Sequence, residues 1–350
     1  MARTDKPITL HDIARETGYS INTVSHALRY KDDIARETGE RIRQIAQEMG
    51  YTGNQIASSL RSGRTHLLAV ILGGMSNPFY GIMADTIQDA AQAAGYTLII
   101  MCSRDDAAME ARLVEQAIAR RVDGIVLFPT GNSGATVARL KAAGMPFVLM
   151  ARYLEEGEAD CVVCDEEEGA YMATRHLIEG GRRRLAYISS TTVVFSSERR
   201  IKGFIRACDE LGIPETDRTI RVANASILSH RRAQDWQATL ADDLRQLKND
   251  GFDGLFVFCD VEAWHALDVI MNTDDLSVED FGIVSFDNLE KALSYPVPIC
   301  SVGSDYEEMA RRCVELLRTR IHRDTCPPST IVCPVFLQCR GSCEKTEDRQ

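Results

Sequence analysis

Hydrophobic and polar residues follow two different patterns along the chain, and the first covers residues 8–60. This part contains only short helical patterns, without the alternating or continuous apolar runs that form strands. Thr9 is expected to cap a helix over residues 10–17, with Asp12 three residues on as its capping-box partner. Gly18 is expected to end this helix, because glycine readily adopts the left-handed conformation found after a helix C-terminus.

Two more helices are predicted in the same part of the chain. Ser20 is expected to cap the segment 21–28, in which Val24 and Ala27 face the interior. The helix after it ends at Gly50, and its buried stripe with the spacing i, i+3, i+4, i+7 consists of Ile42, Ile45, Ala46 and Met49. Three helices with a glycine-containing turn between the first two match a helix-turn-helix, although a plain three-helix bundle with a polar face has the same pattern.

From residue 67 onward, apolar runs of strand length alternate with amphipathic helical segments. The expected strands are 67–72, 96–101, 124–128, 147–150, 185–188, 254–258 and 282–286. Near-continuous apolar strands separated by helices are typical of a parallel sheet covered on both faces. The stretch is long enough for two α/β lobes with parallel sheets. A ligand is expected at the carboxyl ends of the strands, in a cleft between the lobes.

The charge of the chain is unevenly distributed. The net charge is −11, but residues 1–66 carry a net charge of +2 and the remainder carries −13. This distribution suits a protein that meets nucleic-acid phosphate only through its N-terminal part. We find no secretory signal and no apolar run approaching the roughly 18 residues of a membrane span. We therefore expect a cytoplasmic protein that does not contact the membrane.

The eleven cysteines are expected to be reduced thiols, since no export signal is present. Cys161 and Cys164 have the spacing of a redox or metal pair, but they lie in an apolar segment that reads as a strand, whose alternate side chains face opposite ways. No histidine at zinc-finger spacing accompanies the cysteines of the tail, which are Cys326, Cys333, Cys339 and Cys343. We expect both groups to be structural, with no bound metal and no cofactor.

Two other classes of protein share part of this pattern. An enzyme is disfavoured because the segment 72–76 lacks the third glycine of a dinucleotide fingerprint, and neither a P-loop nor a nucleophile elbow is present. An exported solute-binding protein would share the α/β body, but it would have a signal peptide and would lack the helical head. The head therefore favours a DNA-binding protein over both.

In a helix-turn-helix, the early residues of the second helix read base edges in the major groove. The side chains expected to be exposed there are Ile21, Asn22, Ser25, His26 and Arg29. Asn22 can pair with adenine, Ile21 can pack on a thymine methyl, and His26 and Arg29 can donate to guanine or phosphate. The hydroxyls suited to phosphate contacts that position the head are those of Thr9, Ser20 and Thr23.

A dense series of residues in the head carries a family resemblance. It consists of Ile8-Thr9-Leu10-His11-Asp12-Ile13-Ala14, Gly18-Tyr19-Ser20, Thr23-Val24-Ser25, Leu28, Gly50-Tyr51, Asn54 and Ala57-Ser58-Ser59-Leu60-Arg61. These residues resemble the head of the lactose-repressor (LacI/GalR) family of bacterial transcription regulators. The resemblance implies a helix-turn-helix over residues 10–29. It also implies a hinge helix capped by Asn54, which enters the minor groove with Leu60 as the wedging side chain and Ala57 beside it.

The short hinge segment cannot hold a helix alone in water and is expected to become ordered on DNA. Two positions depart from the family pattern. His26 stands where the family usually has arginine, which puts the base sequence of the operator in doubt. Gly53 stands where the family usually has proline, which suggests a looser hinge.

The body resembles the same family more thinly, up to residues 340–342. The similar landmarks are Ser76-Asn77-Pro78-Phe79-Tyr80, Asp123-Gly124-Ile125, Asp165, Arg200-Ile201-Lys202-Gly203-Phe204 and Ser285-Phe286-Asp287-Asn288. The resemblance implies the type I periplasmic-binding-protein fold and a polar effector such as a sugar. It makes Phe79 and Tyr80 the stacking rings, and Asp165, Arg200 and Asp287 the hydrogen-bonding groups.

Further effector contacts implied by the resemblance are Phe258, Ser196 and Arg152. Each of these assignments has a plainer alternative. Asp165 and Asp287 could simply cap the helices that follow them, Arg200 could be a surface arginine, and Phe258 could belong to the core. The family pattern is shifted near Trp264, and either Asp260 or Glu262 could be its acidic residue.

These observations predict a transcription regulator, acting as a repressor by default, and not an enzyme. The expected parts are a head at 1–53, a hinge helix and linker at 54–65, an effector-binding and dimerisation domain at 66–343, and a polar tail at 344–350. The expected partners are a pseudo-palindromic double-stranded operator, a small-molecule effector and a second copy of the chain. Only a few polar residues follow Ser342, so we expect a homodimer and not a tetramer.

Overall fold

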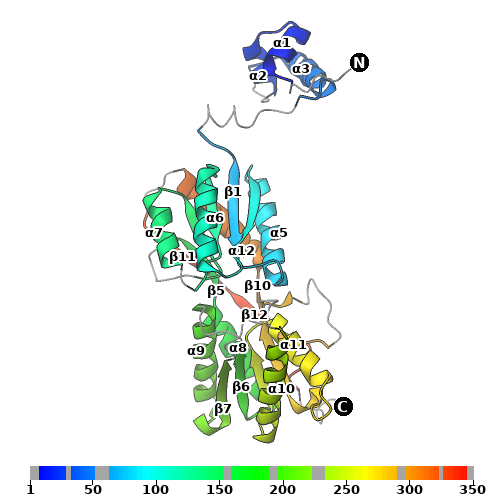
Figure 1. Cartoon of the computed structure of the whole chain (residues 1–350), viewed down its shortest axis with the longest axis vertical. Coiled ribbons are helices and arrows are strands. Elements are labelled where there is room, and N and C mark those ends of the chain that lie inside the picture. Colours follow the sequence, from blue (N-terminus) through cyan, green and yellow to red (C-terminus); the bar gives the residue numbers. More distant parts are fainter. Residues whose placement is uncertain are drawn as a thin grey trace. The chain divides into compact units, whose positions relative to one another are not determined.

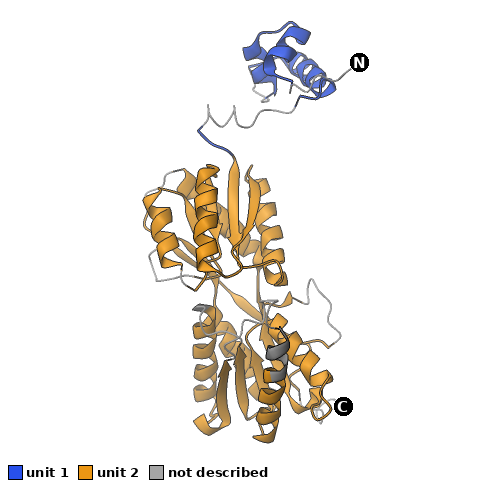
Figure 2. Cartoon of the chain, in the orientation of Figure 1, with its two compact units in different colours: residues 1–65 blue, residues 66–350 orange. Residues whose placement is uncertain are grey.

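The computed structural model describes residues 8–28, 33–51, 63–131, 133–152, 159–189, 195–222, 233–289, 297–322 and 326–344. The chain divides into two compact units, residues 1–65 and residues 66–350 (Figure 2). We describe each unit by itself. Arg29 and the hinge residues Asn54, Ala57 and Leu60 lie outside the described residues.

The first unit contains three helices, α1 (Leu10–Thr17), α2 (Ile21–Leu28) and α3 (Arg36–Glu48) (Figure 1). The predicted capping box is confirmed, since the Asp12 amide donates to the Thr9 hydroxyl and the Thr9 amide donates to the Asp12 carboxylate. Gly18 ends α1 with a φ of 73°, as predicted. The Thr23 amide donates to the Ser20 hydroxyl over 3.1 Å, which confirms the cap on α2.

Side chains from all three helices meet in one small core. Its fully buried members are Ile13, Val24, Ala27, Ile42 and Ala46. The predicted apolar stripe of α3 is therefore only half confirmed, because Ile45 and Met49 remain partly exposed. Burial of one face of each short helix is what stabilises them, since eight-residue helices are marginal alone.

The second unit contains two lobes, each built on a six-stranded sheet (Figure 1). In the lobe that includes β1, here called the N-lobe, the strand order is β11-β5-β4-β3-β1-β2. These strands are all parallel, and their bounds are β1 Leu67–Leu72, β2 Thr97–Cys102, β3 Gly124–Leu127, β4 Phe147–Met150, β5 Cys161–Cys164 and β11 Thr330–Cys333. One face is covered by α5 (Pro78–Ala93) and α12 (Tyr306–Ile321), and the other by α6 (Ala107–Ala119) and α7 (Gly134–Ala142).

In the other lobe, here called the C-lobe, the order is β12-β10-β9-β8-β6-β7. The strand bounds are β6 Leu185–Ser189, β7 Arg218–Val222, β8 Gly254–Val257, β9 Gly282–Phe286, β10 Cys300–Ser304 and β12 Val335–Gln338. Helices α8 (Glu166–Glu179) and α9 (Phe195–Glu210) cover one face, and α10 (Ala233–Asn249) and α11 (Asp260–Met271) cover the other. Short 3₁₀ turns occupy Glu215–Asp217 and Val278–Asp280.

The predicted two-lobed parallel architecture is confirmed with one correction. Strand β12 pairs antiparallel with β10, so the C-lobe sheet is mixed. The chain path explains this antiparallel pairing. Strand β10 runs toward the N-lobe, because α12 follows it there, whereas β12 runs away from the N-lobe, because only Pro334 separates it from β11. Cys161 and Cys164 lie in β5 and join different core clusters, as expected for alternate faces of a strand.

Within the described residues, the chain passes between the lobes at three places. These are Asp165 after β5, Asp305 before α12, and Pro334 between β11 and β12. Asp165 and Asp305 each cap the helix that follows, since their side chains accept the amides of Glu168 and Glu308. Among the helices that the structure describes, none is both long and apolar enough to cross a membrane.

Candidate functional site

Arg200 of α9 lies buried between two carboxylates of the C-lobe. Its Nε donates to Glu166 Oε2 over 2.6 Å, and its Nη2 lies 3.7 Å from Asp287 Oδ1. The side chains of Arg200 and Glu166 are each only 5% exposed. The guanidinium also lies over the rings of Phe286 and Phe258, with its central carbon 3.7 Å and 4.5 Å from their centroids. Arg200 is therefore not the ordinary surface arginine that the sequence left possible.

The close approach of α8 and α9 brings Arg200 to Glu166. Gly203 lies one turn after Arg200, and a Cβ added there would lie 2.8 Å from the Ala170 Cβ and would also meet the Glu167 backbone carbonyl. Only glycine lets the two helices pack at this separation. The motif Arg200-Ile201-Lys202-Gly203 thus contains both the buried cation Arg200 and the glycine that lets α9 pack closely against α8.

Asp287 follows β9 and is held in a strained backbone conformation. Its φ is 99°, and that of Asn288 is 49°, both in the region that L-residues rarely adopt. Its backbone carbonyl accepts a hydrogen bond of 2.6 Å from the hydroxyl of Tyr306, the first residue of α12. Burial raises the pKa of the Asp287 carboxyl to about 7, although Arg200 acts in the opposite direction. Asp287 therefore does not cap a following helix in the described residues. It presents a readily protonated carboxyl.

Arg152 and Tyr80 form the N-lobe part of the same region. Arg152 donates to the Tyr80 hydroxyl over 3.2 Å, to the Pro129 carbonyl over 3.1 Å and to Asp105 Oδ1 over 3.4 Å. Burial opposes the charge of Arg152, but Tyr80, Asp105 and Glu166 hold its pKa above the usual value. Arg152 therefore stays charged on the N-lobe side of the region.

A glycine explains part of this arrangement. A Cβ on Gly73, which follows β1, would lie 2.6 Å from the Tyr80 hydroxyl and 2.8 Å from Asp105 Oδ1. Gly73 therefore leaves room for the Tyr80 hydroxyl. Burial raises the pKa of Tyr80 to about 12, so its hydroxyl stays protonated and can donate.

Aromatic and apolar side chains from both lobes pack together beside the charged groups. Phe79 meets the rings of Tyr80, Phe128 and Tyr306 with centroid distances of 5.4, 6.4 and 5.6 Å. Phe79 and Ile82 of α5 also pack into the C-lobe cluster of Cys259, Val261 and Leu289. The predicted stacking residue Phe79 therefore joins the lobes.

Asp260 secures the turn that carries Asp287. It accepts the hydroxyls of Ser285 and Ser301, the latter over 2.6 Å, and the Leu289 amide over 2.5 Å. The Ser301 hydroxyl also accepts the Asn288 amide over 2.9 Å. Burial raises the pKa of Asp260 to about 6. Of the two acids that the sequence left open, Asp260 therefore supports the strand ends, and Glu262 is buried in the same helix.

The structure brings together most of the predicted effector residues. Tyr80, Arg152, Arg200, Phe258 and Asp287 are linked by the contacts above. Asp165 caps α8, as its plainer alternative held, and Ser196 is buried in the first turn of α9. Four residues of the region were not predicted from the sequence, namely Asp105, Phe128, Glu166 and Tyr306. Glu166 was hidden in the acidic run after β5, which reads as an ordinary helix N-terminus.

In the head, α2 presents Ile21 and Asn22 to solvent, and Ile21 is 39% exposed. The expectation that Ser25 is exposed is wrong, because Ser25 is only 7% exposed. Ser25, which follows Val24, lies on the buried face of α2. The His26 Nδ1 lies 2.7 Å from the Asp33 carboxylate.

The hydroxyls predicted to contact phosphate have local partners. Thr9 donates to Asp12 over 2.7 Å, and the Ser20 and Thr23 hydroxyls lie 2.8 Å apart. Thr9 and Ser20 are exposed and Thr23 is half-buried. They cap the first two helices and remain near solvent at the helix N-termini.

Comparison with known proteins assigns each unit. Residues 9–54 match the family described as bacterial regulatory proteins, lacI family, and residues 68–322 match the periplasmic binding protein domain. The chain belongs to the lacI family of bacterial regulatory proteins. It is 28% identical over 306 residues to the HTH-type transcriptional regulator DegA of Bacillus subtilis (strain 168), covering 86% of this chain and 88% of that protein. It is 25% identical over 314 residues to the HTH-type transcriptional repressor PurR of Aliivibrio salmonicida (strain LFI1238), covering 89% and 92%.

Solved structures of lacI-family regulators share the fold. The lac repressor dimer bound to operator and the anti-inducer ONPF has a TM-score of 0.81 at 19% identity, covering 97% of this chain and 100% of that one. The CelR–cellobiose complex has a TM-score of 0.68 at 24% identity, covering 96% and 99%. The lacI-family head followed by a periplasmic-binding-like body, predicted from sequence, is confirmed.

Proposed function

We propose that this lacI-family chain is a sequence-specific DNA-binding transcription regulator, acting as a repressor, whose operator affinity is controlled by a small polar metabolite. The proposal rests on the presence of a lacI-family head and a periplasmic-binding-like body in one chain. The exposed start of α2 suits base readout, and the buried charged cluster between the lobes suits a ligand rich in hydroxyl groups. Relatives named as transcription regulators support a regulatory role over an enzymatic one. A DNA-binding regulator would act in the cytoplasm.

In the head, we propose that Ile21, Asn22 and His26 read base edges, with Arg29 as a further contact. We propose that Thr9, Ser20 and Thr23 contact phosphate. Ser25 is withdrawn as a base contact because of its burial. We also propose, from the sequence, a hinge helix capped by Asn54 that places Ala57 and Leu60 in the minor groove. The proposed domain limits lie near residues 53, 65 and 343.

In the body, we propose that the effector lies among Tyr80, Arg152, Arg200, Phe258 and Asp287. Hydroxyl groups of a sugar or related metabolite can donate to Asp287 and accept from the two guanidinium groups. A flat apolar face of the ligand can meet the aromatic side chains Phe79 and Phe258. Asp165 and Ser196 are assigned here only from the family pattern.

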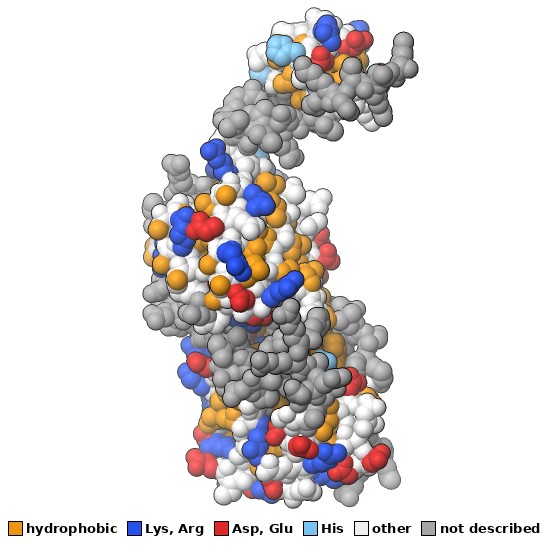
Figure 3. Space-filling model, in the orientation of Figure 1, with side chains coloured by type: hydrophobic (Ala, Val, Ile, Leu, Met, Phe, Trp, Pro, Cys, Tyr) orange, Lys and Arg blue, Asp and Glu red, His pale blue; other side chains and the backbone are white. Residues whose placement is uncertain are grey.

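We propose a homodimer in which two heads contact successive major grooves of a pseudo-palindromic operator. Strand β2 supports self-association, because it is an edge strand whose apolar residues are only half-buried and whose Ile100 is 43% exposed. Hydrophobic side chains gather over the N-lobe in the view of Figure 3. Light scattering should give a dimer, and a tetramer at micromolar concentration would contradict this part.

The test is selection of duplexes from a random library by the full chain, followed by a thermal-shift screen of polar metabolites. The proposal predicts an inverted-repeat site and at least one metabolite that changes affinity for it. Enrichment of no inverted repeat, with or without stabilising metabolites, would refute the proposal.

A further inference from the structure

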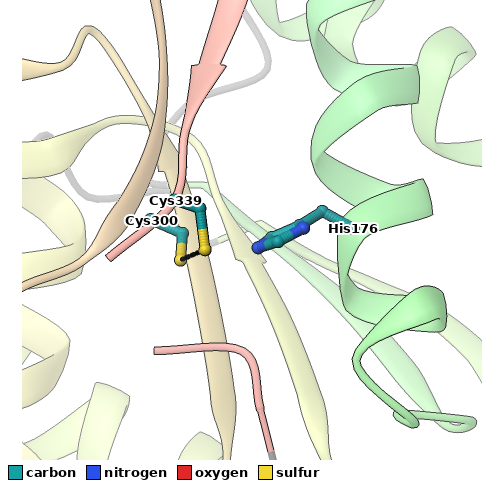
Figure 4. Close-up of side chains that lie close together, drawn as sticks. All are labelled: His176, Cys300 and Cys339. Carbon is teal, nitrogen blue, oxygen red and sulfur yellow. Dashed lines mark hydrogen bonds between the residues drawn. The ribbon is translucent and has the colours of Figure 1, made fainter. Parts of the chain in front are cut away.

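Three side chains of the C-lobe with metal-ligating atoms meet outside the group of proposed effector residues (Figure 4). They are His176 in the last turn of α8, Cys300 at the start of β10, and Cys339 just after β12. One ligand atom from each lies within 4.8 Å of the other two. The sulfurs of Cys300 and Cys339 are 3.9 Å apart, and Figure 4 shows the imidazole pointing toward them.

The environment of these atoms fits a bound cation. The His176 Nε2 is buried and finds no hydrogen-bond partner among the described residues. A buried ring nitrogen without a partner is costly, and coordination of a cation would satisfy it. The Arg340 amide donates to the Cys300 sulfur over 3.2 Å, as backbone amides do when they stabilise a metal-bound thiolate.

Cys343 offers a fourth thiol beside these three residues. Its side chain is fully buried, and the hydroxyl of its neighbour Ser342 accepts the Cys300 amide over 2.8 Å, which places this segment next to Cys300. The spacing of Cys339 and Cys343 lets one short segment contribute both sulfurs. Spacing along the chain could not pair the tail cysteines with His176, because it lies more than a hundred residues before Cys300.

Charge compensation is also present. Arg182 is buried, and its guanidinium donates to the backbone carbonyls of Cys343 and Glu344 over 3.1 Å each. Three thiolates and one neutral histidine around a divalent cation carry a net negative charge, which a nearby buried arginine would offset.

We propose that His176, Cys300, Cys339 and Cys343 form a structural zinc site that fastens the C-terminal segment to α8 and β10. Three sulfurs and one imidazole are a donor set of tetrahedral structural zinc sites, and thiolates favour zinc over the harder divalent cations. A zinc ion with four protein ligands would have no open coordination position for catalysis. The site is separate from the effector region, so it extends the proposed function without depending on it.

The test uses the full chain, purified under reducing conditions from zinc-supplemented medium without chelator. Elemental analysis should find about one zinc per chain, and a thermal melt should shift downward when a chelator removes it. Cobalt substitution should give the absorption of a tetrahedral thiolate-bound ion. Cys339→Ser is the main variant because Cys339 is exposed and its replacement leaves the core intact. His176→Gln is the second variant.

Both variants should bind zinc at least about tenfold more weakly and lose the chelator response. Cys326→Ser is the matched control, since Cys326 is an exposed cysteine outside the cluster, and it should behave as the wild type. Should His176→Gln fail to fold, Cys339→Ser alone decides. Three outcomes would overturn the proposal: reduced wild type without stoichiometric zinc, undiminished zinc affinity in folded Cys339→Ser, or a Cys300–Cys339 disulfide in place of metal.

Discussion

Replacement of Arg200 by methionine tests the buried charge cluster most sharply. The substitution keeps the length and apolar stem of the side chain but removes the cation between Glu166 and Asp287. Glu166 is 5% exposed and its oxygen lies 2.6 Å from the Arg200 Nε, so it would be left charged in a place that water hardly reaches. Removing one partner of a buried ion pair destabilises proteins by about 3–5 kcal/mol, and we expect a loss of this size in the free energy of unfolding.

The assay is urea denaturation of the full chain at neutral pH, followed by circular dichroism. Arg199→Met is the matched control, because Arg199 is its neighbour in α9 but is 32% exposed and lies 3.5 Å from Glu167. A pair of this kind contributes about 0–1 kcal/mol. The double variant Arg200→Met with Glu166→Gln removes the stranded charge and should recover at least about 1 kcal/mol of the loss.

The reasoning would be refuted by equal losses for Arg200→Met and Arg199→Met. It would also be refuted if the double variant were less stable than Arg200→Met, since that would assign the loss to packing on the Phe258 and Phe286 rings and not to the unpaired carboxylate.

Three further predictions concern the turn, the helix contact and the head. The pKa of Asp287 is raised to about 7 in the folded chain, whereas the unfolded chain releases this proton near pH 4. Proton binding by the Asp287 carboxyl therefore stabilises the folded chain at low pH, and this contribution to the free energy of unfolding is lost as the pH rises toward 7. Relative to wild type, Asp287→Asn should therefore gain about 2 kcal/mol between pH 5 and pH 7 in urea melts, and parallel pH profiles would contradict this. Gly203→Ala should cost about 1–3 kcal/mol because its Cβ meets α8, whereas Gly81→Ala, whose Cβ meets nothing within 4 Å, should not destabilise; equal melting temperatures would count against the close contact. Asn22→Ala should cost about 1–3 kcal/mol of operator binding and relax preference at one base pair, and an unchanged selected sequence would exclude Asn22 as a base reader.

Local sequence signals predicted those parts of the fold that local physics decides. The capping box of Thr9 and Asp12, the stop at Gly18 and the apolar strand Leu67–Leu72 all appear in the structure as predicted. Each depends on residues within a few positions of one another, through a hydrogen bond, a left-handed turn or a continuous apolar run.

Other features depend on packing between distant segments and left no local signal. Asp165 and Glu166 are adjacent acids after one strand, but only Glu166 turns inward, because α9 delivers Arg200 to that side of α8. The burial of Ser25 likewise depends on how widely α2 packs in the head. The antiparallel pairing of β12 follows from a return of the chain to the C-lobe that no periodicity records.

The central claim is that one chain couples a DNA-reading head to a metabolite-sensing body. The most direct measurement is the affinity of the full chain for its selected duplex with and without a stabilising metabolite, together with the affinity for that metabolite with and without the duplex. The account predicts salt-sensitive DNA binding and the same coupling factor in both directions, as linkage requires. Duplex affinity that no bound metabolite alters would contradict it.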